Sequence, residues 1–211
     1  MVAVAILRTE RVAVVGAGAG GAVSVAAIVL AAGGGSRFAE SGGEGNKLLA
    51  PYLGRPVVQW AIEHAATAGL DATYVVVGDT DVPLPAGVGV VRIVRNERWR
   101  EGLATSLQAG LRSAKRDAYG TIVVGLGDQP LVPAEAWRRV AYTRAPIAVA
   151  TYDGVRGNPV RLSSHVWPLL PKTGDEGARK VMRRRPDVVV EVPCPGSPAD
   201  IDTVADLEPG A

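Results

Sequence analysis

The residues best suited to phosphate chemistry lie in one early segment of the chain. Three consecutive glycines, Gly33–Gly35, are followed by Ser36 and Arg37, and Lys47 comes ten positions after Arg37. Glycine lets backbone N–H groups approach phosphate oxygens closely, because no side chain stands in the way. Arginine binds a phosphate as a fork of N–H donors, and lysine binds it as a point charge. The segment therefore predicts a cradle for a triphosphate, although three glycines alone are also typical of an ordinary turn.

Two aspartate motifs could supply a metal site. Asp128 directly follows an apolar run and Gly127, and Asp200 and Asp202 stand two positions apart near the C-terminus. Proteins hold Mg²⁺ with one or two carboxylates, together with phosphates and water. We therefore expect Asp128 and Asp202 to share one Mg²⁺. The alternatives are that Asp128 only forms a turn or a helix cap, and that Thr203 caps a short helix beside Asp202.

A third segment, residues 96–107, joins an expected strand to an expected helix. Gly102, Thr105 and Ser106 fall where that helix begins. Backbone and hydroxyl groups at a helix N-terminus can bind an anion, so these residues suit a phosphate or the edge of a base. They could also do no more than cap the helix.

The elements that must position these residues alternate between strands and helices. Apolar runs predict strands over Val25–Ala32, Thr73–Val77, Val88–Val94, Thr121–Leu126, Ile147–Thr151 and Val188–Val192, and helical patterns cover Pro56–Ala68, Leu103–Ala114, Pro133–Thr143, Ser163–Leu170 and Glu176–Arg184. This alternation predicts an α/β fold, a single Rossmann-like three-layer domain with a mostly parallel sheet. Ligands of such sheets bind beyond the carboxyl ends of the strands, where the glycine loop and Asp128 are both expected.

The composition fits one globular domain without a disulfide. The chain has 211 residues, of which 47% are hydrophobic, a formal net charge of +2 and one cysteine, Cys194. This charge is too small to indicate binding to nucleic acid or to a membrane surface. A single cysteine excludes an internal disulfide, which favours a cytoplasmic location.

Residues 1–22 are expected to form an N-terminal extension, and residues 23–211 the main domain. The stretch from Val12 to Ser36 carries no charge and is long enough to cross a bilayer. Its interrupting glycines favour a flexible lead-in over a membrane or export segment. Gly16–Gly21 fits the G-x-G-x-x-G pattern, but the next strand leaves no room for the helix that a pyrophosphate site requires.

The motifs taken together resemble those of the molybdenum cofactor cytidylyltransferase family, within the MobA-like NTP transferase group. The matching segments are, in order, Leu30–Arg37, Lys47–Leu49, Gly54–Pro56, Asn96–Ser106 with Trp99 and Gly102, Gly127–Pro130, Gly157–Val160, Gly174–Arg179 and Asp200–Thr203. The chain departs from the pattern in the longer spacing between Arg37 and Lys47. It also departs in Asn158, where many relatives carry histidine.

The resemblance implies a nucleotide-diphospho-sugar transferase type of fold and a reaction. A phosphate of the acceptor attacks the α-phosphate of an NTP, and pyrophosphate leaves. CTP is the favoured NTP, and molybdopterin carrying molybdenum is the favoured acceptor. A molybdoenzyme is a further possible partner.

The resemblance also implies roles for individual residues. The catalytic residues are Arg37, Lys47 and Asp128, and Asp128 and Asp202 bind Mg²⁺. The nucleotide side comprises Leu30, Ala31, Ala32, Gly33, Gly34, Gly35, Ser36, Arg37, Lys47, Gly102, Ser106 and Gly127, and the acceptor side comprises Asn158 and Pro159. Two alternatives stay open: another NTP transfer, of the guanylyl or nucleotide-sugar type, and a non-catalytic nucleotide-binding module that serves a molybdoenzyme.

Overall fold

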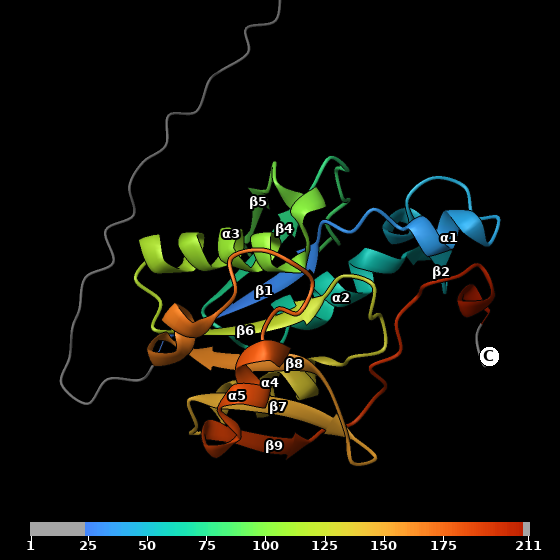
Figure 1. The fold of residues 1–211 in the computed structure, drawn as a ribbon. Helices are drawn as coiled ribbons and strands as arrows, with labels where there is room; N and C mark the ends of the chain where they lie inside the picture. The colour runs from blue at the N-terminus through green and yellow to red at the C-terminus, as the bar shows by residue number, and fades with distance from the viewer. Residues whose placement is uncertain (1–23, 209–211) are drawn as a thin grey trace, which may run out of the picture.

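The computed structural model describes residues 24–208, which build one seven-stranded sheet covered by helices (Figure 1). The strand order is β5-β4-β1-β6-β8-β7-β9, and a separate two-stranded sheet pairs β2 with β3. The strands are β1 (Val25–Ala31), β2 (Pro51–Tyr52), β3 (Arg55–Pro56), β4 (Ala72–Val77), β5 (Val91–Arg95), β6 (Thr121–Leu126), β7 (Ile147–Tyr152), β8 (Val155–Ser163) and β9 (Val189–Pro193). The helices are α1 (Ser36–Glu40), α2 (Val57–Ala66), α3 (Leu103–Arg116), α4 (Ala134–Tyr142) and α5 (Arg179–Arg184). No helix in this part of the chain is long and apolar enough to cross a membrane.

The sheet is the middle layer of three. Side chains alternate across a strand, so β1 sends Ala27 and Val29 to one face and Ala26 and Ile28 to the other. Helices α2 and α4 cover the first face, and α3 and α5 cover the second. Every residue of β1 is buried, as is typical of a central strand with helices on both faces. The expected three-layer α/β fold is confirmed.

Strand β8 was not expected from the sequence and is the antiparallel member of the sheet. It pairs antiparallel with β6 on one side and with β7 on the other. Asp153 and Gly154 separate it from β7, and both have positive φ angles, as two-residue hairpin turns require. Because β8 runs backwards, its first residues lie at the edge where β6 and β7 end. Asn158 therefore lies in a strand at the carboxyl edge of the sheet.

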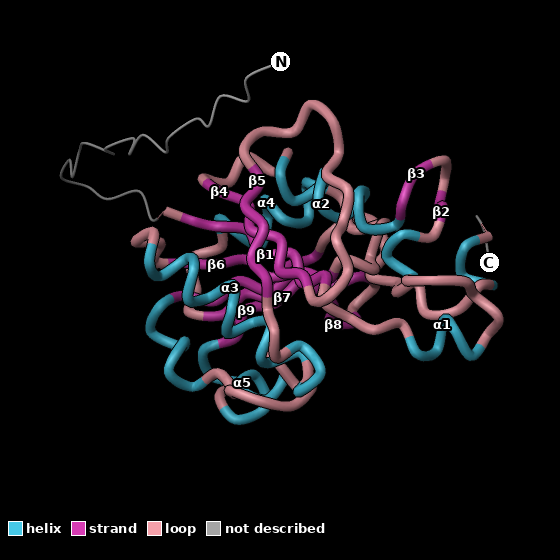
Figure 2. Tube along the Cα trace, turned by 90° about the horizontal axis from the view of Figure 1, so that it is seen from above, coloured by secondary structure: helices cyan, strands magenta, loops and turns pink. Residues whose placement is uncertain are grey.

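The other differences from the expected elements are small. The expected helix 176–184 covers only Arg179–Arg184, and the expected helix 163–170 is a 3-10 helix over Ser164–Leu169. The long spacing between Arg37 and Lys47 holds most of the short helix α1, which lies beside the C-terminal segment (Figure 2). The Val204 N–H donates to Ser41 Oγ at 3.0 Å and ties this segment to the end of α1. The proposals on residues 1–22, including the pattern at Gly16–Gly21, lie outside the described residues.

Close packing against β6 gives a test of the fold. A Cβ at Gly125 would lie 2.5 Å from Cζ2 of the buried Trp137 ring of α4. Overpacking a core of this density costs about 1–3 kcal/mol, so we expect Gly125→Ala to lower the free energy of unfolding in urea by that amount. Gly120→Ala is the matched control, because nothing lies within 4 Å of a Cβ there. Equal losses in the two variants would contradict this packing.

Candidate active site

The centre of the candidate site is an ammonium group between two carboxylates. Lys47 Nζ lies 2.6 Å from Asp128 Oδ2 and 2.8 Å from Asp202 Oδ1. Asp128 follows the end of β6, and Lys47 begins a 3-10 helix that the Asn46 side chain caps by accepting from the Leu48 N–H at 2.9 Å. The Ile201 N–H donates to the Asp128 carbonyl at 2.9 Å. Three segments far apart in the sequence are thereby fixed at one point.

Burial and charge act in opposite directions on Lys47. The residue is 8% exposed, and burial alone favours the neutral amine. The charges and hydrogen bonds of Asp128 and Asp202 outweigh burial and raise the pKa of Lys47 above its ordinary value. Lys47 is therefore a cation at neutral pH. Arg37 adds a second ion pair to Asp202 from an exposed position.

The aspartates also fit a divalent cation. Asp128 Oδ1 is buried and has no hydrogen-bond partner among the described residues, so one carboxylate oxygen remains free to ligate. Within residues 24–208, no cluster of three or more His, Cys, Asp or Glu side chains could hold a metal by itself. Two carboxylates with ligands completed by phosphates and water are what Mg²⁺ prefers. The Lys47 ammonium group lies between the two carboxylates, and its contact with the phosphates stays a prediction.

Asp200 and Asp206 complete the acidic end of the site. Burial, followed by the nearby charge of Asp128, raises the pKa of Asp200. Asp206 accepts hydrogen bonds from the N–H groups of Asp202 and Thr203, at 3.0 and 2.7 Å, and from the Thr203 hydroxyl at 2.8 Å. The alternative in which Thr203 caps the last helix is wrong, because Val204 stands at its N-cap and the Thr203 side chain donates to Asp206 instead. Sequence reasoning missed Asp206, and the available signal was a carboxylate three residues after Thr203, placed to reach back to the preceding N–H groups.

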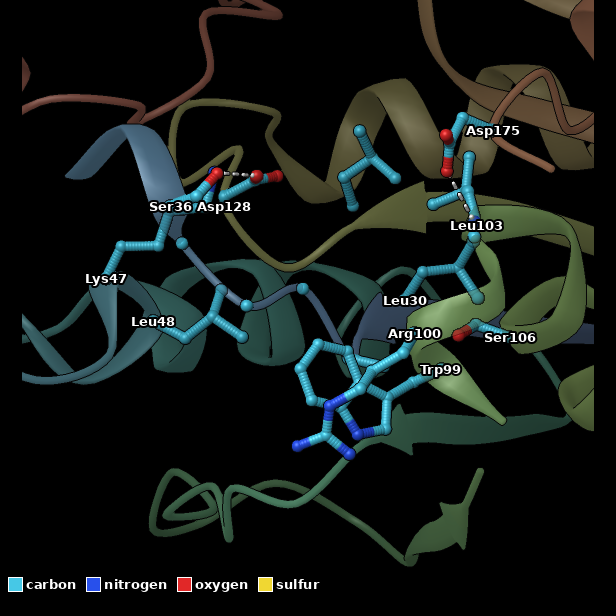
Figure 3. A pocket seen from close by; sticks show the side chains of 16 residues that line it. Leu30, Ser36, Lys47, Leu48, Trp99, Arg100, Leu103, Ser106, Asp128 and Asp175 are labelled. Atoms are coloured by element: carbon cyan, nitrogen blue, oxygen red, sulfur yellow. Dashed lines mark hydrogen bonds and ion pairs between the residues drawn. The ribbon is translucent and has the colours of Figure 1, made fainter. Parts of the chain in front are cut away.

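A cavity of about 560 Å³ opens beside Asp128 (Figure 3). Ten of the predicted residues line it: Leu30, Ala32, Gly33, Gly34, Gly35, Ser36, Lys47, Gly102, Ser106 and Asp128. Three residues predicted on the nucleotide side do not line it: Ala31, Arg37 and Gly127. The Gly127 N–H donates to the Leu30 carbonyl at 2.8 Å, and Arg37 lines a second cavity instead. We call this space the loop cavity.

Trp99, Arg100 and Asp175 also line the loop cavity and were not among the predicted site residues. The Trp99 ring packs on Gly34, where a Cβ would lie 3.1 Å from the ring. Its Nε1 donates to Asp79 at 2.9 Å, and the Arg100 guanidinium stacks 4.4 Å from its centroid. Trp99 stands in the N-x-x-W motif, so the sequence did carry a signal for it.

Helix α3 enters the loop cavity at its N-terminus. A Cβ at Gly102 would lie 2.6 Å from the Gly174 backbone, so only glycine fits this contact. The Asn96 side-chain amide donates to the hydroxyls of Thr105 and Ser106, at 2.9 and 3.0 Å. Asn96 therefore fixes the position of the Ser106 hydroxyl in the lining of the cavity.

A second cavity of about 460 Å³ lies on the other side of Asp128, and we call it the strand cavity. Asn158, Asp202 and Arg37 line it, whereas Pro159 does not. The Asn158 amide donates to Gln129 Oε1 at 3.1 Å, which fixes its orientation. Asp128 lines both cavities and is therefore placed to act on groups from each.

Comparison with known proteins identifies the family of the chain. Residues 27–189 match the MobA-like NTP transferase domain. The chain is 31% identical over 198 residues to the nicotine blue oxidoreductase of Paenarthrobacter nicotinovorans. The aligned region covers 87% of this chain and 94% of that protein. Mth528, a nucleotidyl transferase from Methanothermobacter thermautotroptrophicus, superimposes with a TM-score of 0.70 at 25% identity, over 87% of this chain and 94% of that one.

A further solved structure holds a metal. Rv0371c from Mycobacterium tuberculosis H37Rv, solved as a complex with manganese, superimposes with a TM-score of 0.69 at 27% identity, over 87% of this chain and 95% of that one. These matches confirm the nucleotide-diphospho-sugar transferase fold and the resemblance drawn from the motifs. The chain therefore belongs to the MobA-like NTP transferase family and is a nucleotidyltransferase.

Proposed function

We propose that this nucleotidyltransferase transfers CMP from CTP to the phosphate of an organic acceptor, molybdopterin that carries molybdenum. The observation that carries the proposal is the position of Asp128, which lies between the loop cavity and the strand cavity beside Lys47 and Asp202. A nucleotide in the loop cavity and an acceptor in the strand cavity would meet at this residue. Such transfer depends on alignment and on neutralising charge.

In this proposal the chain's own residues divide the work. The amides of Gly33–Ser36, with Lys47, bind the β- and γ-phosphates from the loop cavity. Arg37 contacts phosphate from the strand cavity, which it lines, and Asn158 contacts the acceptor there. An acceptor phosphate oxygen forms a bond to the α-phosphorus, and the bond from that phosphorus to the β-phosphate oxygen breaks, releasing pyrophosphate. Asp128 and Asp202 would hold Mg²⁺, which when bound neutralises phosphate charge.

A second candidate rests on the name of one relative. The protein from Paenarthrobacter nicotinovorans is called an oxidoreductase, and it is 31% identical over 94% of its own length. Oxidation or reduction of nicotine blue without release of pyrophosphate would favour that activity. Nucleotide binding with neither reaction would favour a non-catalytic module.

Nucleotide choice is the direct test of the proposal. We expect pyrophosphate release to be fastest with CTP when each of the four NTPs is supplied with Mg²⁺ and the molybdopterin acceptor. EDTA should abolish it, because two carboxylates and a buried lysine cannot neutralise a triphosphate alone. A clear preference for GTP would contradict the CMP transfer and leave the family's general reaction intact.

A further inference from the structure

The strand cavity has two chemically different ends. At one end Asp128, Asp200 and Asp202 come from the end of β6 and from the C-terminal segment. At the other end Arg156 comes from β8, and Arg179 and Arg183 come from α5. The proposed reaction places the attacking phosphate of the acceptor at the aspartates, so it leaves the arginines without a role.

The floor between these ends is apolar. It is formed by Leu126, Val149, Val160, Ala178 and Met182, which belong to β6, β7, β8 and the start of α5. Small-molecule sites are mostly apolar surfaces with a few placed polar groups. A floor of this kind suits a ring-sized apolar body lying across the strands.

The positions of the strands set the length of the cavity. Arg156 pairs with Thr151 of β7 in the strand register, and its Nε donates to Glu191 of β9 at 2.7 Å. The sheet order is β6-β8-β7-β9, and neighbouring strands lie about 4.8 Å apart. Arg156 therefore reaches toward β9, away from the end of β6 that Asp128 follows.

Two of the three arginines already have carboxylate partners. Arg156 pairs with Glu191, and Arg183 pairs with Glu176. Within residues 24–208, no carboxylate lies within ion-pair distance of Arg179. Residues four apart are neighbours on a helix surface, so Arg179 and Arg183 present two guanidinium groups on one side of α5. Asp175 and Glu176 also line the cavity, but neither makes an ion pair with Arg179, whose guanidinium therefore remains free to bind an anion.

We infer that the strand cavity binds an acceptor with a second anionic group, which takes no part in the attack on the α-phosphorus and which Arg179 holds. The acceptor is then an organic phosphate with an apolar, ring-sized body between its two anionic groups. A guanidinium favours carboxylate- or phosphate-like oxyanions, which it can contact with two parallel hydrogen bonds. The inference rests on the proposed use of the strand cavity for the acceptor.

A binding experiment tests the inference without relying on turnover. The probes are naphthalene-1-sulfonate and naphthalene-1,5-disulfonate, which share one ring body and differ by one anionic group. Mg²⁺ is present in every measurement, because a sulfonate at the other end faces Asp128, Asp200 and Asp202 and is repelled without a cation. We then expect the wild-type chain to bind the disulfonate about tenfold more tightly, since a charge-assisted hydrogen bond contributes at least that factor. Arg179→Met should abolish this preference, and Arg179→Lys should retain part of it.

Arg184→Met is the matched control, because Arg184 lies on α5 and is exposed but does not line the strand cavity. It should keep the full preference for the disulfonate. An equal affinity of the wild-type chain for both probes would overturn the inference, as would a preference that survives in Arg179→Met.

Steady-state kinetics separates this inference from the proposed function. With CTP and the molybdopterin acceptor, Arg179→Met should raise the KM for the acceptor by about 10- to 100-fold. The KM for CTP and kcat should stay within about twofold of the wild-type values. An unchanged acceptor KM in an active variant would overturn the inference alone. Failure of the wild-type chain to use this acceptor would overturn the proposed function, and the sulfonate probes would still decide the role of Arg179.

Discussion

Replacing Asp128 by asparagine is expected to lower kcat by about 10²–10³-fold, the usual loss when one preorganised charge-stabilising group is removed. Asparagine keeps the shape of the side chain and removes its charge. Asp128 carries the free carboxylate oxygen of the site and lines both cavities, so its charge is the one that the nucleotide and the acceptor share. The measurement is pyrophosphate release under saturating CTP and Mg²⁺, with circular dichroism to check the fold.

The same substitution at Asp202 and at Asp200 shows how the loss of turnover depends on the contacts of each carboxylate. Asp202→Asn should lower turnover to a similar extent, because its carboxylate contacts both Lys47 and Arg37. Asp200→Asn should cost less than about tenfold, a loss under about 1.4 kcal/mol, because neither Lys47 nor Arg37 makes an ion pair with it. Near-wild-type turnover in Asp128→Asn, or full activity of the wild-type chain in EDTA, would contradict the shared metal ion.

Replacing Lys47 by methionine should lower kcat by about 10²–10³-fold and also make the stability of the protein depend on metal. Methionine keeps most of the apolar stem but leaves the carboxylates of Asp128 and Asp202 facing each other without a cation. Removing one partner of a buried ion pair costs about 3–5 kcal/mol. The loss should fall below that range here, since the two aspartate side chains are 18% and 21% exposed.

Mg²⁺ should restore much of the stability that Lys47→Met loses, because a cation that binds only the folded state stabilises it. The measurement is urea unfolding with and without Mg²⁺ in the absence of nucleotide, and the wild-type chain should respond little. Arg37→Ala is the control: its side chain is 71% exposed, so its ion pair should contribute at most about 1 kcal/mol. A Lys47→Met variant as stable as wild type, or one indifferent to Mg²⁺, would contradict this account.

The part of the site built from contiguous motifs could be predicted from the sequence. The run before Gly33 is apolar on both faces, so it could only be a buried strand, and β1 ends two residues before that glycine. The same argument applies to β6, whose observed bounds equal the expected ones. A parallel sheet brings the ends of such strands to one edge, and both the loop and Asp128 lie there.

The antiparallel strand could not be read from alternation alone. Residues 155–163 contain Arg156, Asn158 and Arg161, and this polarity hides a strand whose first half is exposed and second half buried. The local turn chemistry did carry the information: Asp153-Gly154 is a preferred two-residue hairpin turn. A connection that short leaves no space for the crossover that a parallel neighbour needs.

The position of Lys47 depended on charges that are distant in sequence. Its partners lie 81 and 155 positions away, as the residue numbers 128 − 47 and 202 − 47 show. No local pattern reports which of several ligands a lysine contacts when a polyanion and two carboxylates share one site. The lysine contacts the negative charge that lies nearest to it, and only the folded structure determines which charge that is.

The hairpin of β7 and β8 allows the residues that line the strand cavity to change in evolution independently of those that line the loop cavity. The walls of the loop cavity come mainly from residues before 107, whereas the arginines and most of the floor of the strand cavity come from residues 149–183. Drift within the later stretch can reshape one compartment while the inherited phosphate chemistry in the other is preserved. Descendants of one ancestor could in this way come to act on unrelated molecules, and a hairpin turn between two strands is a place where such divergence can begin without disturbing the rest of the sheet.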